Sequence, residues 1–301
     1  MTTAFVLSGG GSLGAVQVGM LRALADRHIT PDLLVGTSAG ALNASYLAGR
    51  GTGASAVAGL AASWIATRRG DVFPIEPARQ VLALGGARPS LFTDRGLRRL
   101  VTRHVDYARL EDAAIAVFLV ATDLLSGQEI VMSRGDALSA VLASTALPGI
   151  LPTVHREGMA LVDGGLADNA AISVAVAQGA DTVFVLPAGY SCALTAAPST
   201  VLTTALQSLG ILIQQRLISD VAYFADRVDL KVLPPLCPVS VSPSDFRQAR
   251  TLIDRAYMSS SRWIDDGGLD RPHPEQFLSL HSHRGQRHVA DVPAIPDRSA
   301  R

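Results

Sequence analysis

The sequence predicts an α/β protein, built as a three-layer α/β/α sandwich around a mostly parallel central sheet. Two strand-loop-helix units follow one another near the N-terminus, and in each a short apolar run passes through a glycine-containing loop into a helical stretch. Further apolar runs alternate with helical stretches downstream, as in sheets whose parallel strands are joined by crossover helices. The length of 301 residues fits one main domain, residues 1–265, followed by a polar extension, residues 266–301.

The individual elements follow from the spacing of the apolar residues. Strands are expected where short apolar runs end at turn residues, at 4–7, 33–35, 114–121, 129–132, 159–162 and 182–186. Helices are expected where apolar residues recur every three or four positions, at 12–24, 41–47, 94–104, 137–145 and 199–218. The region 79–106 is interpreted as an insertion or lid. In the last helix one apolar face is expected to pack against the sheet, formed by Leu202, Leu206, Leu209 and Ile213.

The composition limits the classes of function. Hydrophobic residues make up 48% of the chain and charged residues 17%, which indicates a globular protein. Basic and acidic residues both number 26, so no nucleic-acid partner is expected. Cys192 and Cys237 are too few and too far apart in sequence for a zinc site or a disulfide framework, and we interpret them as core thiols in a reducing compartment. The N-terminus lacks the features of a signal peptide, so we expect a cytoplasmic location with transient contact to a membrane surface.

The strongest chemical motif is the segment Gly36-Thr37-Ser38-Ala39-Gly40, which fits G-x-S-x-G. In that pattern a serine occupies a strained turn between a strand and a helix, and the flanking glycines let neighbouring backbone pass close by. An apolar strand precedes the motif here and a helical stretch follows it. Ser38 is therefore a candidate nucleophile. The alternative is an ordinary glycine-serine turn that caps a helix.

A second glycine loop lies between the first predicted strand and helix. Gly9, Gly10 and Gly11 lack Cβ atoms and can turn backbone amides toward a developing negative charge, so the loop can act as an oxyanion hole. The same loop also satisfies the dinucleotide pattern G-x-G-x-x-G through Gly14. Its expected acidic partner should end the second strand, whereas Asp32 precedes that strand, which makes a dinucleotide site the weaker hypothesis.

A third motif, Asp163-Gly164-Gly165, follows another short strand. A carboxylate held at such a turn can approach the Ser38 hydroxyl and accept its proton during attack on an ester. Taken alone, the segment would be an ordinary Asp-Gly turn. Its occurrence after two other glycine-rich motifs, each behind an apolar strand, favours the catalytic interpretation.

These three motifs, in this order, resemble the patatin-like phospholipase family of bacterial type. The resemblance covers about residues 4–186, and it includes the segment Ala143-Ser144-Thr145-Ala146-Leu147-Pro148 and the pair Asp168-Asn169. It implies a patatin-like catalytic domain that cleaves lipid acyl esters, phospholipids among them, through a Ser-Asp dyad. In that reaction Ser38 forms an acyl-enzyme, Asp163 is the general base, and Gly9, Gly10 and Gly11 supply the oxyanion hole. No metal or organic cofactor is expected, and the expected partner is a lipid or acyl-ester substrate.

Two departures from the family pattern keep other functions open. Leu13 stands where many members have a basic residue, and Ala171 stands where a proline commonly occurs. The alternatives are a small-ester or thioester hydrolase, a transacylase, or a non-catalytic lipid-binding regulator. A late group of histidines would also fit a Ser-Asp-His order, although a solvated tail is the preferred interpretation: His273, His281, His283 and His288.

Overall fold

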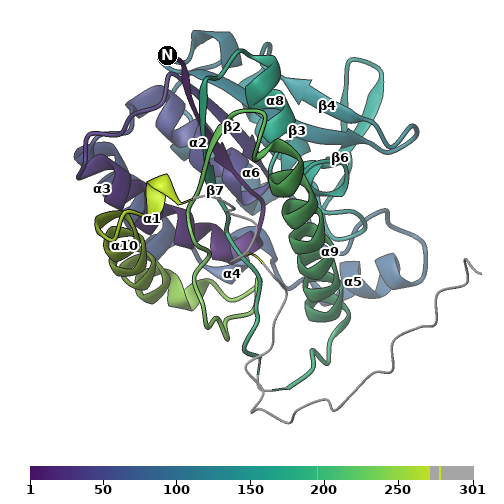
Figure 1. Cartoon of the computed structure of the whole chain (residues 1–301). Helices are drawn as coiled ribbons and strands as arrows, with labels where there is room; N and C mark the ends of the chain where they lie inside the picture. Colours follow the sequence, from purple (N-terminus) through teal and green to yellow (C-terminus); the bar gives the residue numbers. More distant parts are fainter. Residues whose placement is uncertain (195, 272–277, 279–301) are drawn as a thin grey trace, which may run out of the picture.

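A computed structural model describes residues 1–194, 196–271 and 278, and it shows an α/β fold around one sheet (Figure 1). Five strands are parallel and lie side by side in the order β3 (Ala116–Asp123), β2 (Leu33–Thr37), β1 (Thr3–Leu7), β7 (Thr182–Leu186) and β8 (Asp229–Val232). Three further strands are antiparallel to their neighbours: β4 (Glu129–Met132), β5 (Val154–Arg156) and β6 (Met159–Asp163). The predicted, mostly parallel α/β sheet is thereby confirmed, and the strand expected at 129–132 forms β4, the antiparallel hairpin neighbour of β3.

Helices cover both faces of the sheet. One face carries α1 (Gly14–Ala25), α2 (Ala39–Arg50), α3 (Ala54–Ala66), α6 (Arg95–His104), α7 (Ala137–Ser144) and α10 (Ala249–Asp265). The other face carries α8 (Ile172–Ala177) and α9 (Val201–Phe224). Two short helices, α4 (Arg69–Val72) and α5 (Pro77–Leu84), lie between α3 and α6 in the chain. The sequence had not predicted β5, β8, α8 or α10.

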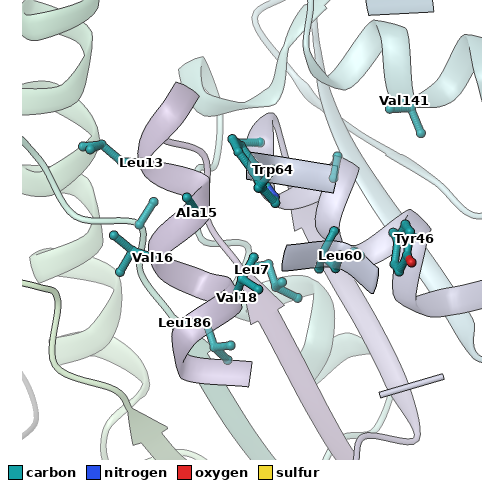
Figure 2. Packing of buried hydrophobic residues seen from close by; sticks show 14 of the residues in the cluster. Leu7, Leu13, Ala15, Val16, Val18, Tyr46, Leu60, Trp64, Val141 and Leu186 are labelled. Carbon is teal, nitrogen blue, oxygen red and sulfur yellow. The ribbon is translucent and has the colours of Figure 1, made fainter. Parts of the chain in front are cut away.

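The strand residues divide between two cores because successive side chains in a strand point to opposite faces of the sheet. In β1, Phe5 and Leu7 belong to the core beneath α1, whereas Ala4 and Val6 belong to the core beneath α8 and α9. Figure 2 shows Leu7 at the end of β1 beside Val18 of α1, with Trp64 of α3 beyond. Each face of the sheet thus has its own helical cover, which gives the predicted three layers.

One edge of β3 pairs with two different strands, β2 and β6, and the other edge pairs with β4. The β3 residues Ala121 and Thr122 pair with both β4 and β6, so those two strands occupy opposite edges of β3. Because β2 and β4 both pair with Val120, they are also on opposite edges. It follows that β2 and β6 share an edge and approach each other end to end from opposite directions. Thr37, the last residue of β2, pairs with Val120, and Asp163, the last residue of β6, pairs with Ala121.

The helix α9 differs from its prediction. It runs six residues past the expected end at 218, to Phe224. Of the four residues expected to pack against the sheet, Leu202 and Leu206 are buried in the core that includes α1, and Leu209 packs against that core. Leu209 and Ile213 also line a cavity that contains the end of β6. The core between the sheet and α8 instead receives Leu217 and Val221, further along the helix.

The last described residue, Leu278, is buried, and its carbonyl oxygen accepts a hydrogen bond of 2.7 Å from the side chain of Gln214. The four late histidines of the sequence analysis lie outside the described residues. Among the residues that the structure describes, no helix combines the length and the apolar character needed to cross a bilayer.

Candidate active site

Ser38 occupies a strained turn between β2 and α2. Its φ of 55° and ψ of −120° place a non-glycine residue at positive φ, a costly conformation that surrounding structure must hold. The two glycines of the motif allow the close packing that does so. A Cβ on Gly40 would lie 2.0 Å from the carbonyl oxygen of Leu7, and a Cβ on Gly36 would lie 2.6 Å from the carbonyl oxygen of Gly40. The sequence motif therefore forms the strained strand-to-helix serine turn that it predicts.

Ser144, at the end of α7, fixes this turn from the side. Its hydroxyl accepts the backbone N–H of Ser38 at 3.0 Å and donates to the carbonyl oxygen of Val120 at 2.6 Å. All three residues are buried. One hydroxyl therefore satisfies a donor and an acceptor where β2 has ended, and it connects the strained turn to β3.

Asp163 is buried at the end of β6 and is tightly held. Its backbone N–H donates to Ala146 at 2.9 Å, its carbonyl oxygen accepts from the hydroxyl of Thr122 at 3.0 Å, and its Oδ1 accepts the N–H of Gly165 at 2.8 Å. The other carboxylate oxygen, Oδ2, is buried and has no hydrogen-bond partner of regular geometry among the described residues. Oδ2 is thus the oxygen that remains to receive a proton.

The Ser38 side chain lies close enough to Asp163 to affect its ionisation. Burial raises the pKa of Asp163 to about 6, while the nearby Ser38 side chain and the hydrogen bond from the N–H of Gly165 oppose that rise. The Ser38 hydroxyl does not form a hydrogen bond of regular geometry with Oδ2 of Asp163, which has no such partner among the described residues. Such looseness is common in catalytic pairs without substrate, which tighten when the substrate binds. The structure thus brings together the predicted nucleophile and the predicted base.

The glycine loop adjoins the same two residues. Its first amide is already used, because Gly9 donates its N–H to Oδ1 of Asn169 at 2.9 Å. Gly10 and Gly11 make no backbone N–H donation within the described part of the chain. Gly11 has a φ of 59°, and a Cβ there would lie 2.6 Å from the carbonyl oxygen of Pro243. Two of the three predicted oxyanion donors are therefore free to bind a ligand, and the third instead anchors the loop.

Buried side chains hold this loop in place. Gln17 of α1 donates its side-chain amide to the carbonyl oxygens of Ser8 and Leu186, at 2.7 and 2.9 Å. The hydroxyl of Ser8 accepts the N–H of Ala188 at 2.9 Å. These bonds connect the loop to the end of β7, so its free amides are presented by a rigid frame, which is what electrostatic stabilisation of a transition state requires.

Two cavities meet at Ser38. The first is the larger of the two, and its mostly apolar lining includes Trp64, Phe73, Leu97 and Leu100. The second is bounded by the glycine loop, Asp163, residues 189–191 and the N-terminal half of α9. Ser38 itself is only 9% exposed, and it lines both cavities.

Other titratable groups near the site have separate structural roles. His104 lines the first cavity, but its Nδ1 is 2.8 Å from the carbonyl oxygen of Leu100 and its Nε2 is 2.6 Å from the hydroxyl of Ser63. Burial lowers the pKa of His104, which keeps the ring neutral. Burial, together with the neighbouring Asp220 and Glu129, raises the pKa of Asp168 to about 7. Within the described residues, no group of three His, Cys, Asp or Glu side chains could hold a metal ion.

The structure contradicts the dinucleotide alternative. Asp32 lies at the start of β2, where its carboxylate accepts the backbone N–H of Thr3 at 2.8 Å and its own N–H donates to the Thr3 carbonyl oxygen at 2.8 Å. Both contacts are at the N-terminal ends of the strands, whereas the glycine loop follows the C-terminal end of β1. No ribose held near the glycine loop could reach this carboxylate.

Sequence reasoning missed several residues that shape the site. Ser144 and Asn169 lay in segments that resembled a family pattern, but nothing in the sequence assigned them the hydrogen bonds they make. The apolar wall formed by α6 fell in the region interpreted as an insertion or lid. Its signal was present, since the buried residues Leu97, Leu100 and Val101 recur at helical spacing.

Comparisons with known proteins identify sequence relatives of this chain. The chain is 32% identical over 191 residues to patatin-like phospholipase domain-containing protein 6 of Mus musculus, and the matched segment covers 62% of this chain and 14% of the relative. It is 30% identical over 198 residues to lysophospholipase NTE1 of Mycosarcoma maydis, covering 63% of this chain and 10% of the relative. The chain thus spans only about a seventh or less of the length of these relatives.

Among solved structures, the chain is similar to VipD from Legionella pneumophila, with a TM-score of 0.47 and 17% identity over 88% of this chain and 67% of that one. A family model described as patatin-like phospholipase matches residues 5–176, which contain all three motifs and both members of the serine-aspartate pair. The chain belongs to the patatin-like phospholipase family.

Proposed function

We propose that this protein is a serine acyl hydrolase that cleaves acyl esters of lipids through a Ser38–Asp163 dyad. One observation carries the proposal: β2 and β6 end at adjacent positions on the same edge of β3, and this brings the hydroxyl of Ser38 to a buried carboxylate whose Oδ2 is unpaired within the described residues. The family match supports the class of substrate.

The reaction proceeds in two acyl transfers. As the Ser38 oxygen attacks the ester carbonyl carbon, Oδ2 of Asp163 accepts the hydroxyl proton. The negative charge on the carbonyl oxygen is stabilised by the N–H groups of Gly10 and Gly11. The alcohol leaves with the proton from Asp163, and an acyl group remains on Ser38. Water then attacks this acyl-enzyme, gives its proton to Asp163, and releases the fatty acid while Ser38 regains its proton.

The cavities indicate which parts of the substrate the protein recognises. The larger, apolar cavity suits an acyl chain, because it would exchange water for hydrocarbon contacts with Trp64, Phe73 and Leu97. Among the residues that the structure describes, no Lys or Arg lines either cavity. Leu13, at the position where many family members have a basic residue, is buried and lines the second cavity. Selectivity is therefore expected to come from the acyl chain and to depend weakly on a phosphate head group.

A transient contact with a membrane surface forms part of the proposal. Phe73 lines the acyl cavity, and the chain then passes directly to Ile75 and α5, which carries several exposed apolar side chains: Ile75 is 74% exposed, Val81 69% and Leu84 70%. An apolar surface that continues from the cavity wall would help a lipid enter from a bilayer. Replacing Val81 and Leu84 by Asp is expected to reduce sedimentation with phosphatidylcholine vesicles and leave hydrolysis of a soluble short-chain ester unchanged.

A fluorophosphonate probe tests the dyad directly. The wild type is expected to become covalently labelled at Ser38, the Ser38→Ala variant to remain unlabelled, and the Asp163→Asn variant to be labelled at least about a hundredfold more slowly. Ser55→Ala, which changes an exposed serine of α3, is the matched control and should label at the wild-type rate. Full esterase activity in Ser38→Ala would refute the proposed nucleophile.

Substrate class needs a separate measurement. Long-chain phospholipid or lysophospholipid vesicles and short-chain soluble esters should be compared at equal concentration. A clear preference for the long chains supports a lipid hydrolase. Equal or better turnover of the short esters would point to a small-ester hydrolase, and labelling without turnover of either would point to a lipid-binding regulator.

A further inference from the structure

The two cysteines of the chain lie in adjacent loops, although they are 45 positions apart in sequence. Cys192 belongs to the loop after β7, residues 187–194, and Cys237 belongs to the loop after β8, residues 233–245. The Cys192 thiol is 3.9 Å from the sulfur of Cys237. Parallel strands that neighbour each other in the sheet end on the same side, which is why the two loops meet.

Hydrogen bonds already hold the two loops side by side at this point. The N–H of Ala193 donates to the carbonyl oxygen of Val239 at 2.8 Å, and the N–H of Val239 donates to the sulfur of Cys192 at 3.3 Å. One step further on, the hydroxyl of Ser191 donates to the carbonyl oxygen of Val241. The two loops are therefore held together beside the cysteines, and bond formation requires the sulfurs to approach from 3.9 Å to the usual sulfur-sulfur length of about 2.05 Å.

Both loops also form walls of the cavity that contains the dyad. Tyr190 and Ser191 line it from the first loop, and Pro243 lines it from the second. Pro243 is also joined to the glycine loop, because its carbonyl oxygen accepts the N–H of Ser12 at 2.8 Å. A covalent bond between the cysteines would therefore fasten together two walls of the active-site cavity.

We propose that Cys192 and Cys237 form a modification site, at which a low-molecular-weight disulfide such as oxidised glutathione converts the two thiols into an intramolecular disulfide that clamps the β7 and β8 loops together. This site is independent of the proposed hydrolase activity. The interpretation of both cysteines as core thiols is wrong for Cys237, which is exposed, whereas Cys192 is buried as expected.

The reaction follows from the unequal exposure of the two sulfurs. Cys237 is exposed and Cys192 is buried, so the Cys237 thiolate attacks the small disulfide first, giving a mixed disulfide and one small thiolate. The Cys192 sulfur then loses its proton to solvent and attacks the Cys237 sulfur, expelling the second small thiolate. The two protein thiols lose two electrons and two protons, and the small disulfide is reduced to two thiols.

The first step is expected to be slow near neutral pH. Desolvation, together with the neighbouring Cys192 thiol, raises the pKa of Cys237 to about 11, so only a small fraction is thiolate. The rate of oxidation should therefore rise by roughly tenfold for each pH unit between about 7 and 9. This dependence separates attack by Cys237 from an oxidation limited by opening of the fold.

The test uses the full chain with oxidised glutathione, followed by alkylation, intact mass measurement and non-reducing peptide mapping. We expect the wild type to lose the mass of two hydrogen atoms, to give one peptide pair containing both cysteines, and to melt about 5 °C higher than the reduced protein, an increase that dithiothreitol abolishes. Because the chain has two cysteines, the assignment is unambiguous.

Matched variants identify the order of attack. Cys192→Ser should accumulate a glutathione adduct on Cys237, because the resolving thiol is gone, whereas Cys237→Ser should remain unmodified. A stable glutathione adduct on the wild type, a disulfide-linked dimer, or recovery of both thiols after prolonged oxidation at about pH 9 would each overturn the proposal. The wild-type mapping decides the question even if a variant does not fold.

Discussion

The hydroxyl of Ser144 accepts the backbone N–H of Ser38 at 3.0 Å, so a residue at the end of α7 holds the strained serine turn from outside the G-x-S-x-G motif. The same hydroxyl donates to Val120, the residue that pairs with the last residue of β2. The position of Ser38 therefore depends on β3 and α7 as well as on its flanking glycines.

Replacing Ser144 by Ala should weaken both folding and catalysis. The change leaves a buried N–H and a buried carbonyl oxygen unpaired, which costs about 1–3 kcal/mol in free energy of unfolding. Because the strained turn loses a restraint, kcat for ester hydrolysis should fall at least about tenfold with little change in KM. Urea denaturation and steady-state kinetics measure the two effects.

Ser260→Ala is the matched control for that prediction. Ser260 is also a buried serine, but its hydroxyl has no partner among the described residues, so its loss should leave the free energy of unfolding nearly unchanged or raise it. Equal destabilisation by both substitutions would show that the hydrogen bonds of Ser144 add little.

The pH dependence of catalysis should report Asp163. The carboxyl must be ionised to accept the Ser38 proton, and its pKa is about 6 because of burial. We expect kcat/KM for a soluble ester to rise with pH and to level off above an apparent pKa of about 6. An acid limb near pH 4, the ordinary range of an exposed carboxyl, would contradict the predicted role of burial.

The stability of the Asp163→Asn variant should depend on pH relative to that of the wild type. A carboxyl whose folded pKa is raised to about 6 stabilises the fold fully only below its unfolded value of 3.8, and that contribution is lost as the pH rises through about 6. The amide that replaces the carboxyl does not ionise. The free energy of unfolding of the variant minus that of the wild type should therefore increase across this window, by at most about 3 kcal/mol. Urea denaturation at about pH 4 and about pH 8 measures this difference, and a difference that decreases with rising pH would contradict the prediction.

Gly40→Ala should abolish or severely impair folding. The added Cβ would lie 2.0 Å from the carbonyl oxygen of Leu7, so α2 would have to move away from β1, and Ser38 with it. Gly70→Ala in α4 is the control, since its Cβ would meet nothing within 4 Å, and it should be neutral or slightly stabilising. Circular dichroism and thermal melting of both variants provide the measurement.

Filling the apolar cavity should change chain-length preference. Leu97 of α6 is buried and lines the larger cavity, so Leu97→Trp would occupy space that the proposal assigns to the acyl chain. We expect kcat/KM to fall at least about tenfold for long-chain esters and to change little for acetate esters. Equal losses for both chain lengths would instead indicate distortion of the catalytic turn.

Local sequence determined much of this protein. Parallel strand-loop-helix units can be predicted from the apolar runs of β1, β2 and β7 and from the glycines between strand and helix, because each of these patterns depends on only a few neighbouring residues. The G-x-S-x-G segment likewise specified a strained serine turn, since close approach of Gly40 to Leu7 and of Gly36 to Gly40 leaves no room for side chains. These features were predictable from the motifs alone.

Tertiary structure alone decided how the separate motifs combine. No local pattern shows that β6 runs antiparallel and ends against the same edge of β3 as β2, yet this register brings Asp163 to Ser38. The same holds for Asn169, which takes the Gly9 amide out of the predicted oxyanion hole, and for Cys192 and Cys237, which meet across two loops. Contacts between residues far apart in the chain depend on strand order and register, and these are set by the packing of the whole sheet against its helices.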